Sequence, residues 1–447
     1  MNKNLLRILI IFILYAPRML QAQTPILSLE DCIDRAMERN FELRMRNEDI
    51  NVAKAGLEIA RKSRLPQLKA GASYLRFSEV MSVNISEQMS GLPLDLPPVQ
   101  LRFGDEDNYT LNMSLVQPIF TGFRLNNQII SAKSALLAEE AVKEADINQL
   151  VYEIKKNYYN YISAVHRKRI AELSLKSVIS HLEDVGNFYD QGLTTYNDVL
   201  KTKIRKSEME LMISRADNQK FLLKKALMHM LGMPLTDSLS IETNLEYRKP
   251  DIGLDDAIDE ALVARPELTS TASTKNALCA AIRSAQAEFY PSISLVGGYE
   301  YGKPGLNKLE NEWMDYWTVG ISAQWHLWDW GIRDEKVQQS RAMVSRIEHS
   351  ESLLLESIRL DVHQAYRKMT EYDSQVRLHK IIREQAEENF RILSDKFNQG
   401  LATNTDYLDA ETQLTKAKLD EIISLAQHCI AVAGLERSMG RNNRRNL

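Results

Sequence analysis

Apolar residues recur every three or four positions through two long segments of the chain, which is the pattern of coiled-coil helices. The first stripe consists of Ile147, Val151, Ile154, Tyr158, Tyr161 and Val165. The second consists of Leu355, Ile358, Val362, Ala365, Met369, Tyr372 and Val376. The first pattern predicts a helix from about Leu125 to Phe188. At ~1.5 Å per residue such a helix would be roughly 95 Å long, far beyond the dimensions of a compact domain.

Four shorter segments alternate apolar residues with small or polar ones, which predicts β-strands with one apolar face. The expected strands lie at about residues 67–82, 108–119, 291–303 and 315–328. All five Trp residues lie in or beside the last of them: Trp313, Trp317, Trp325, Trp328 and Trp330. Tilted strands of about ten residues can cross a bilayer, and Trp rings mark its interfaces. The alternative is a half-buried sheet that packs on a soluble core.

A sheet exposed to lipid must close on itself, because an open edge leaves backbone groups without hydrogen-bond partners in hydrocarbon. Bacterial barrels begin at about eight strands. The four strands of one chain therefore need those of other copies: a dimer would supply eight strands and a trimer twelve.

The same order of elements occurs twice along the chain. Leu29-Glu30-Asp31 corresponds to Leu254-Asp255-Asp256, and Gln191-Gly192-Leu193 corresponds to Gln399-Gly400-Leu401. We therefore expect a first repeat at residues 23–250 and a second at 251–447, each with helices, two strands and a long helical hairpin. The turns of the two hairpins are expected at 191–195 and 399–403.

The N-terminus has the charged, apolar and small-residue sections of a secretory signal peptide, expected at residues 1–22. Its removal takes away Lys3, Arg7 and Arg18, so the formal net charge goes from −4 to −7 (−4 − 3). A nucleic-acid-binding protein is more often basic, which disfavours that class. Beyond the signal no apolar run reaches ~18 residues, which excludes a polytopic helical membrane protein.

No motif of catalysis or metal binding is present. The eight His residues include no H-x-x-x-H pair with Glu beside it, and no G-x-S-x-G string occurs. We therefore expect no enzyme activity, no cofactor and no metal site. The three Cys residues are interpreted as small buried hydrophobic side chains, with a bridge between one pair left open.

In this duplicated order the chain resembles the TolC-like family of bacterial outer-membrane efflux and secretion proteins. The resemblance rests on Pro118-Ile119-Phe120-Thr121-Gly122 before the first long helix and on the segment from Leu327 to Arg333 before the second. It also rests on the two Gly-Leu turns, each followed by Asp-x-Leu.

The resemblance implies a mainly α fold with transmembrane β-strands. It implies a homotrimer whose twelve strands form one β-barrel in outer-membrane lipid, continued through the periplasm by a coiled-coil α-helical barrel. Such a trimer is a passive exit duct that docks with a periplasmic adaptor (membrane fusion) protein and an inner-membrane RND- or ABC-type transporter, and exports small molecules or proteins. The alternative is an exported coiled-coil scaffold or adhesion protein without pore activity.

The two hairpin turns correspond to the periplasmic tips of that family. Gly192 and Gly400 can adopt the left-handed conformation that ends a helix. Leu193 and Leu401 would then be exposed apolar residues, and the resemblance makes all four candidates for contact with the adaptor. The alternative is an ordinary turn of a helical hairpin.

The resemblance also places Asp406 and Asp409 where family members carry acidic rings at the narrow periplasmic entrance, which predicts a preference for cations. In the first repeat Asp198 is retained, and Lys201 replaces the second acid. Phe397 resembles a constricting aromatic residue of that entrance. Helix N-terminal caps for Asp198 and Asp406, and a solvated helix face for Asp409, are the alternatives.

Overall fold

A computed structural model describes residues 26–84 and 100–441, so the expected signal peptide at 1–22 lies outside the described residues. The chain forms two compact units. Among the described residues, unit 1 comprises 26–45, 144–265 and 357–441, and unit 2 comprises 46–84, 100–143 and 266–356. Each unit therefore takes segments from both repeats.

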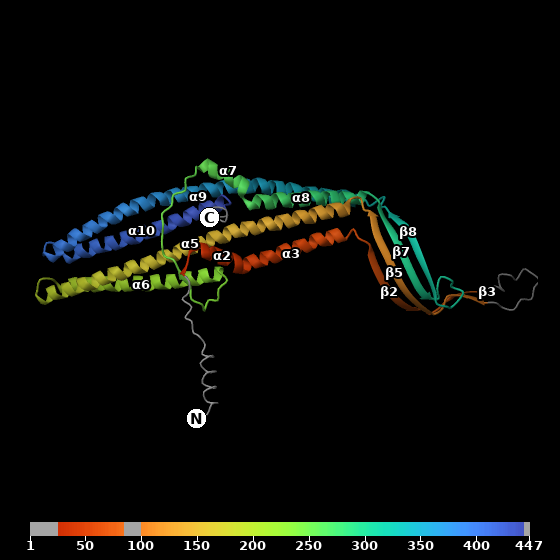
Figure 1. Cartoon of the computed structure of the whole chain (residues 1–447), viewed down its shortest axis with the longest axis horizontal. Coiled ribbons are helices and arrows are strands. Elements are labelled where there is room, and N and C mark those ends of the chain that lie inside the picture. The colour runs from red at the N-terminus through yellow and green to blue at the C-terminus, as the bar shows by residue number, and fades with distance from the viewer. Residues whose placement is uncertain (1–25, 85–99, 442–447) are drawn as a thin grey trace, which may run out of the picture. The chain divides into compact units, whose positions relative to one another are not determined.

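The two repeats contain matching elements (Figure 1). The first contains β1 (Ile26–Leu27), α2 (Leu29–Arg39), α3 (Phe41–Lys62), β2 (Gln67–Arg76), β3 (Met81–Asn84), β4 (Gln100–Phe103), β5 (Asp107–Phe120), α5 (Arg124–Asp190), α6 (Tyr196–Met230) and β6 (Ser240–Ile241). The second contains α7 (Leu254–Ala264), α8 (Pro266–Gln286), η1 (Ala287–Phe289), β7 (Ser292–Lys303), β8 (Met314–Gln324), α9 (Ile332–Asn398) and α10 (Asn404–Ser438). Both α5 and α9 have 67 residues, and both α6 and α10 have 35.

Unit 1 contains α2, α6, α7 and α10, together with α5 from Glu144 onward and α9 from Ser357 onward. The apolar stripe of α5 is buried in a core that it shares with α2 and α6, where Ile154, Leu227 and Leu231 are fully buried. The turn after α6 packs directly on the end of α2: Gly232 has φ +61°, and a Cβ there would lie 2.5 Å from the carbonyl oxygen of Arg39. Only glycine fits this close approach.

Unit 2 contains one antiparallel four-stranded sheet in the order β2-β5-β7-β8. The central pair, β5 and β7, joins the two repeats. Aromatic residues pair across the strands, as Tyr74 does with Tyr109 and Tyr299 with Trp317. Within the described residues β2 and β8 each lack a second neighbour, so both edges of this sheet are open.

Two strands are shorter than their alternating pattern suggested. The first ends at Arg76, and Met81–Asn84 forms a separate pair with Gln100–Phe103. The last ends at Gln324. Past this point the backbone turns into α9 through Trp330 and Gly331, which have φ +58° and +84°, and left-handed backbone cannot continue a strand.

The predicted fold class, mainly helical with four sheet strands in a duplicated unit, is confirmed. None of the helices in residues 26–84 and 100–441 is long and apolar enough to cross a membrane. The three Cys residues are free, and Cys32 and Cys429 are buried.

Candidate functional site at the hairpin tips

Both hairpin turns end their first helix in the same way. The Leu193 amide donates to the carbonyl of Phe188 at 2.8 Å, and the Leu401 amide donates to that of Lys396 at 2.8 Å. Together with a left-handed glycine, at φ +71° in Gly192, this is the Schellman arrangement. An apolar residue at the position of Leu193 or Leu401 often packs back on its helix, yet here they are 69% and 72% exposed. The two leucines therefore present apolar surface to solvent.

The helix that follows each turn starts with a capping box. Thr195 caps α6 and exchanges hydrogen bonds with Asp198, and Thr403 caps α10 and exchanges them with Asp406. The Thr403 hydroxyl and amide donate to Asp406 Oδ2 at 2.7 and 2.9 Å, which holds the pKa of this carboxyl below its ordinary value. Hydrogen bonds from Thr195 lower the pKa of Asp198 in the same way. Both acids thus start helices and remain ionised at neutral pH.

The other charged residues of the first turns differ between the hairpins. Asp409 is exposed one turn beyond Asp406, so α10 carries two acids along one face. On α6 the matching position is Lys201, whose Nζ donates to Thr405 Oγ1 at 3.0 Å. The second hairpin therefore carries more negative charge near its tip than the first.

Phe397 does not lie on an exposed face. It is buried in a cluster that includes Val185, Phe188 and Tyr407, and its ring contacts that of His181 edge to face at 4.7 Å. The apolar contacts between the hairpins enclose this side chain within the single chain. Its resemblance to a constricting aromatic residue of the entrance stays a prediction.

Asn404 forms a polar contact between the two hairpins. Its amide oxygen lies 2.7 Å from His181 Nε2 on α5, and its amide nitrogen donates to the carbonyl of Asp198 on α6 at 3.1 Å. The His181 ring stacks on Tyr407 at 3.6 Å between centroids. Burial lowers the pKa of His181, so the neutral imidazole is favoured. We call these residues, His181, Asn404 and Tyr407, the His181 joint.

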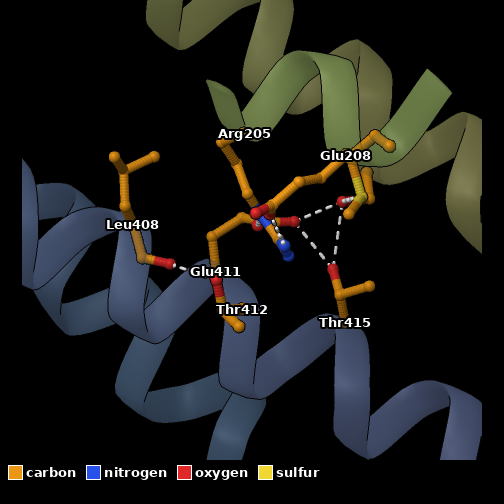
Figure 2. Close-up of polar contacts among 8 residues, drawn as sticks. Arg205, Glu208, Leu408, Glu411, Thr412 and Thr415 are labelled. Carbon is orange, nitrogen blue, oxygen red and sulfur yellow. Dashed lines mark hydrogen bonds and ion pairs between the residues drawn. The ribbon is translucent and has the colours of Figure 1, made fainter. Parts of the chain in front are cut away.

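Glu411 forms a second polar contact two turns further along α10 (Figure 2). Its side chain accepts hydrogen bonds from Ser174 on α5, from Thr415 at 2.7 Å and from Arg205 Nε on α6 at 2.7 Å. Glu411 is only 2% exposed. A buried carboxylate is tolerated when it is paired and hydrogen-bonded, and these partners meet that need. We call this group, Ser174, Arg205, Glu411 and Thr415, the Glu411 joint.

Neither joint was expected from the sequence. The hydrogen-bonded partners lie 223 positions apart in His181–Asn404 and 206 in Arg205–Glu411. One signal was available: Asn404 and Glu411 are seven residues apart, so they share a face of α10. In the part of the chain that the structure describes, no group of three or more His, Cys, Asp or Glu could hold a metal ion.

Comparisons with known proteins agree with this architecture. A family model described as outer membrane efflux protein matches residues 32–233 and 257–441. Outer membrane protein OprJ of Pseudomonas aeruginosa is 23% identical over 427 residues, which cover 92% of this chain and 84% of that protein. Alkaline protease secretion protein AprF of the same species is 23% identical over 337 residues, covering 72% and 69%. The Campylobacter jejuni CmeC outer membrane channel shares the fold at a TM-score of 0.79 and 16% identity, with 92% and 85% of the two chains covered.

Proposed function

Because this chain belongs to the outer membrane efflux protein family and is therefore an outer-membrane channel of an export system, we propose that three copies form one duct that docks with a periplasmic adaptor. An inner-membrane RND- or ABC-type transporter would supply the energy, and the duct would be passive. The alternative of an exported scaffold without a pore is set aside, since the family is one of transport proteins. The resemblance to the TolC-like family is confirmed by the family match.

The sheet supports assembly from several copies. The open edges of β2 and β8 would each pair with a neighbouring copy, because hydrocarbon offers unpaired backbone groups no other partner. Three copies would give twelve strands, an even number within the range of bacterial barrels. On β8 the side chains of Trp317, Val319 and Ile321 are exposed in the single chain. They would form part of the lipid-facing surface.

The hairpin tips are proposed as the adaptor contact. Leu193 and Leu401 are exposed beside their left-handed glycines, and every backbone bond that a Schellman turn needs is already made. An apolar side chain in this position contributes little to its own fold and is free to enter an apolar groove of a partner. Domain boundaries are proposed as the repeats at 23–250 and 251–447, so that each repeat supplies one tip.

Asp406 and Asp409 are proposed to set the ion preference of the periplasmic entrance. In a trimer three copies of each would concentrate negative potential in a constriction, where low-dielectric walls strengthen the field. Asp198 would contribute less, because Lys201 follows it by one turn and compensates its charge. Phe397 would contribute to the constriction indirectly, by packing the two hairpins together, since it is buried between them.

We also propose that opening of the entrance requires the α9–α10 hairpin to shift against the α5–α6 hairpin. The His181 and Glu411 joints both bridge these hairpins, so a shift would break their bonds. Adaptor binding at the tips would bias the equilibrium between the joined and shifted states.

The test is ion selectivity in planar bilayers, measured as the reversal potential in a salt gradient. We expect the wild-type protein to prefer cations and the double variant Asp406→Asn/Asp409→Asn to lose most of that preference. Asp420→Asn is the control for position, because it removes one carboxylate charge from α10 away from the tip, and it is compared with each single variant, Asp406→Asn and Asp409→Asn. Equal selectivity in the double variant and the wild type would contradict the assigned role.

A further inference from the structure

A cavity of about 600 Å³ lies in unit 2, where strands run into helices. Its walls come from the turn between β5 and α5, from the end of α8 with the residues that follow it, and from the first turns of α9. Gly122, in the first wall, has φ +60°, and a Cβ there would lie 2.5 Å from the carbonyl oxygen of Ala287. The turn therefore packs directly on η1, which fixes the two walls against each other.

The charge of this cavity is positive. Arg283 and Arg341 line its open side, where both are exposed in the single chain, and the ion pairs found within residues 26–84 and 100–441 include neither of them. Asp334 is the one acidic side chain in the lining, and it lies seven residues, about 10 Å along α9, from Arg341. The nearby Glu288 is occupied by Lys336 at 2.7 Å. Two guanidinium groups are thus left without a carboxylate.

Aromatic residues of the kind found at membrane interfaces lie beside the cavity. The Trp325 indole donates to the carbonyl of Phe289, a lining residue, at 3.1 Å. Trp328 and Trp330 follow directly and are exposed, which suits rings that sit among lipid headgroups. The guanidinium of Arg333 lies over the Phe289 ring, 5.0 Å from its centroid. The cavity wall is therefore hydrogen-bonded to the Trp-rich segment that follows β8.

We propose that this cavity binds the headgroup of an anionic glycerophospholipid of the phosphatidylglycerol type. Arg283 and Arg341 would hold the phosphate oxygens, since planar guanidinium groups match phosphate geometry. The rings of Phe289 and Tyr290 would contact the glycerol and the first methylene groups. The assignment rests on the proposed orientation, in which the helices lie in the periplasm, so that the lipid comes from the inner leaflet of the outer membrane.

The test is native mass spectrometry of the full chain, purified in detergent and titrated with phosphatidylglycerol, phosphatidylethanolamine or inorganic phosphate. We expect Arg283→Gln and Arg341→Gln each to weaken binding of phosphatidylglycerol about tenfold, because each removes one charge-assisted contact. Arg346→Gln should leave it unchanged, since that arginine is exposed on α9 outside the cavity. Asp334→Asn should strengthen binding, because it removes a like charge.

Several results would overturn the assignment. Equal binding of phosphatidylethanolamine, or weaker binding after Asp334→Asn, would point to pairing of an ammonium with the carboxylate. Inorganic phosphate that binds as tightly as the lipid would mean a simple anion site. Loss of the oligomer in the Arg283→Gln variant would make the cavity a contact between copies. Conductance measured on the same sample tests the duct separately, so a failed lipid site and a failed duct give different results.

Discussion

A substitution in the Glu411 joint tests whether contacts between the two hairpins keep the entrance closed. Glu411→Gln keeps the shape of the side chain and its capacity for hydrogen bonds with Ser174 and Thr415. It removes the negative charge that faces Arg205 across the two hairpins at 2.7 Å. The guanidinium retains Glu208 on its own helix, at 3.0 Å, so no buried charge is left without a partner.

The magnitude follows from the loss of one charge-assisted bond. Hydrogen bonds to charged groups contribute about 1.5–3 kcal/mol. The bond from Arg205 is lost outright, because the amide nitrogen of the introduced glutamine would face Arg205 Nε and both groups are donors. The cost of burying the carboxylate had offset part of this contribution, so the substitution weakens the joined state by about 1–2 kcal/mol. This corresponds to roughly 5–30-fold in the ratio of open to closed channel, since 1.4 kcal/mol is about tenfold.

The assay is single-channel recording of open probability at one fixed voltage. Glu421→Gln is the matched control: Glu421 also lies on α10 and pairs with Arg383 Nε at 2.7 Å, but that partner is on α9, within the same hairpin. We expect Glu411→Gln to raise the ratio of open to closed times and Glu421→Gln to leave it within about twofold. If both variants matched the wild type, or if both opened the channel equally, the proposed role of contacts between the hairpins would be refuted.

Two further results are expected. Replacing Leu193 and Leu401 by Ser should weaken binding of a purified adaptor without lowering the thermal unfolding midpoint. The control Leu378→Ser, at a leucine that is also exposed on α9, should change neither the affinity nor the midpoint. An unchanged adaptor affinity in the Leu193 and Leu401 variant would show that the tips are not part of the interface. Burial lowers the pKa of His181, so its contribution to stability is fully present above its ordinary pKa of about 6.5 and is lost as the pH falls below that value toward the pKa of the folded state. Thermal midpoints measured between about pH 8 and about pH 5 should fall less steeply in His181→Gln than in the wild type, and equal slopes would contradict this assignment.

The helical part of the fold could be predicted because its signal is local. The stripe through Ile154 and Tyr158 repeats at the period of a coiled coil, and a residue's face on a helix follows from its position alone. The ends of the strands were harder to place. The apolar pattern continues to Trp328, yet the strand ends at Gln324, and nothing in a Trp side chain signals the left-handed conformation of Trp330.

The polar joints could not be predicted for a different reason. Glu411 is a buried carboxylate in a stretch of α10 where a charged residue would ordinarily face solvent. Its partners Ser174 and Arg205 become neighbours only when the two hairpins pack together. Phe397 is a similar case: its resemblance to a constricting residue gave no sign that packing of the two hairpins encloses the ring in the single chain.

Copies of this chain are proposed to close their open sheet edges into one conducting duct. The most direct test is the conductance of the detergent-purified protein in planar bilayers, with the oligomer mass determined on the same sample. We expect a mass of three chains and discrete, cation-preferring conductance steps. A water-soluble single chain without conductance, or a conducting oligomer of two chains, would contradict the twelve-stranded assembly.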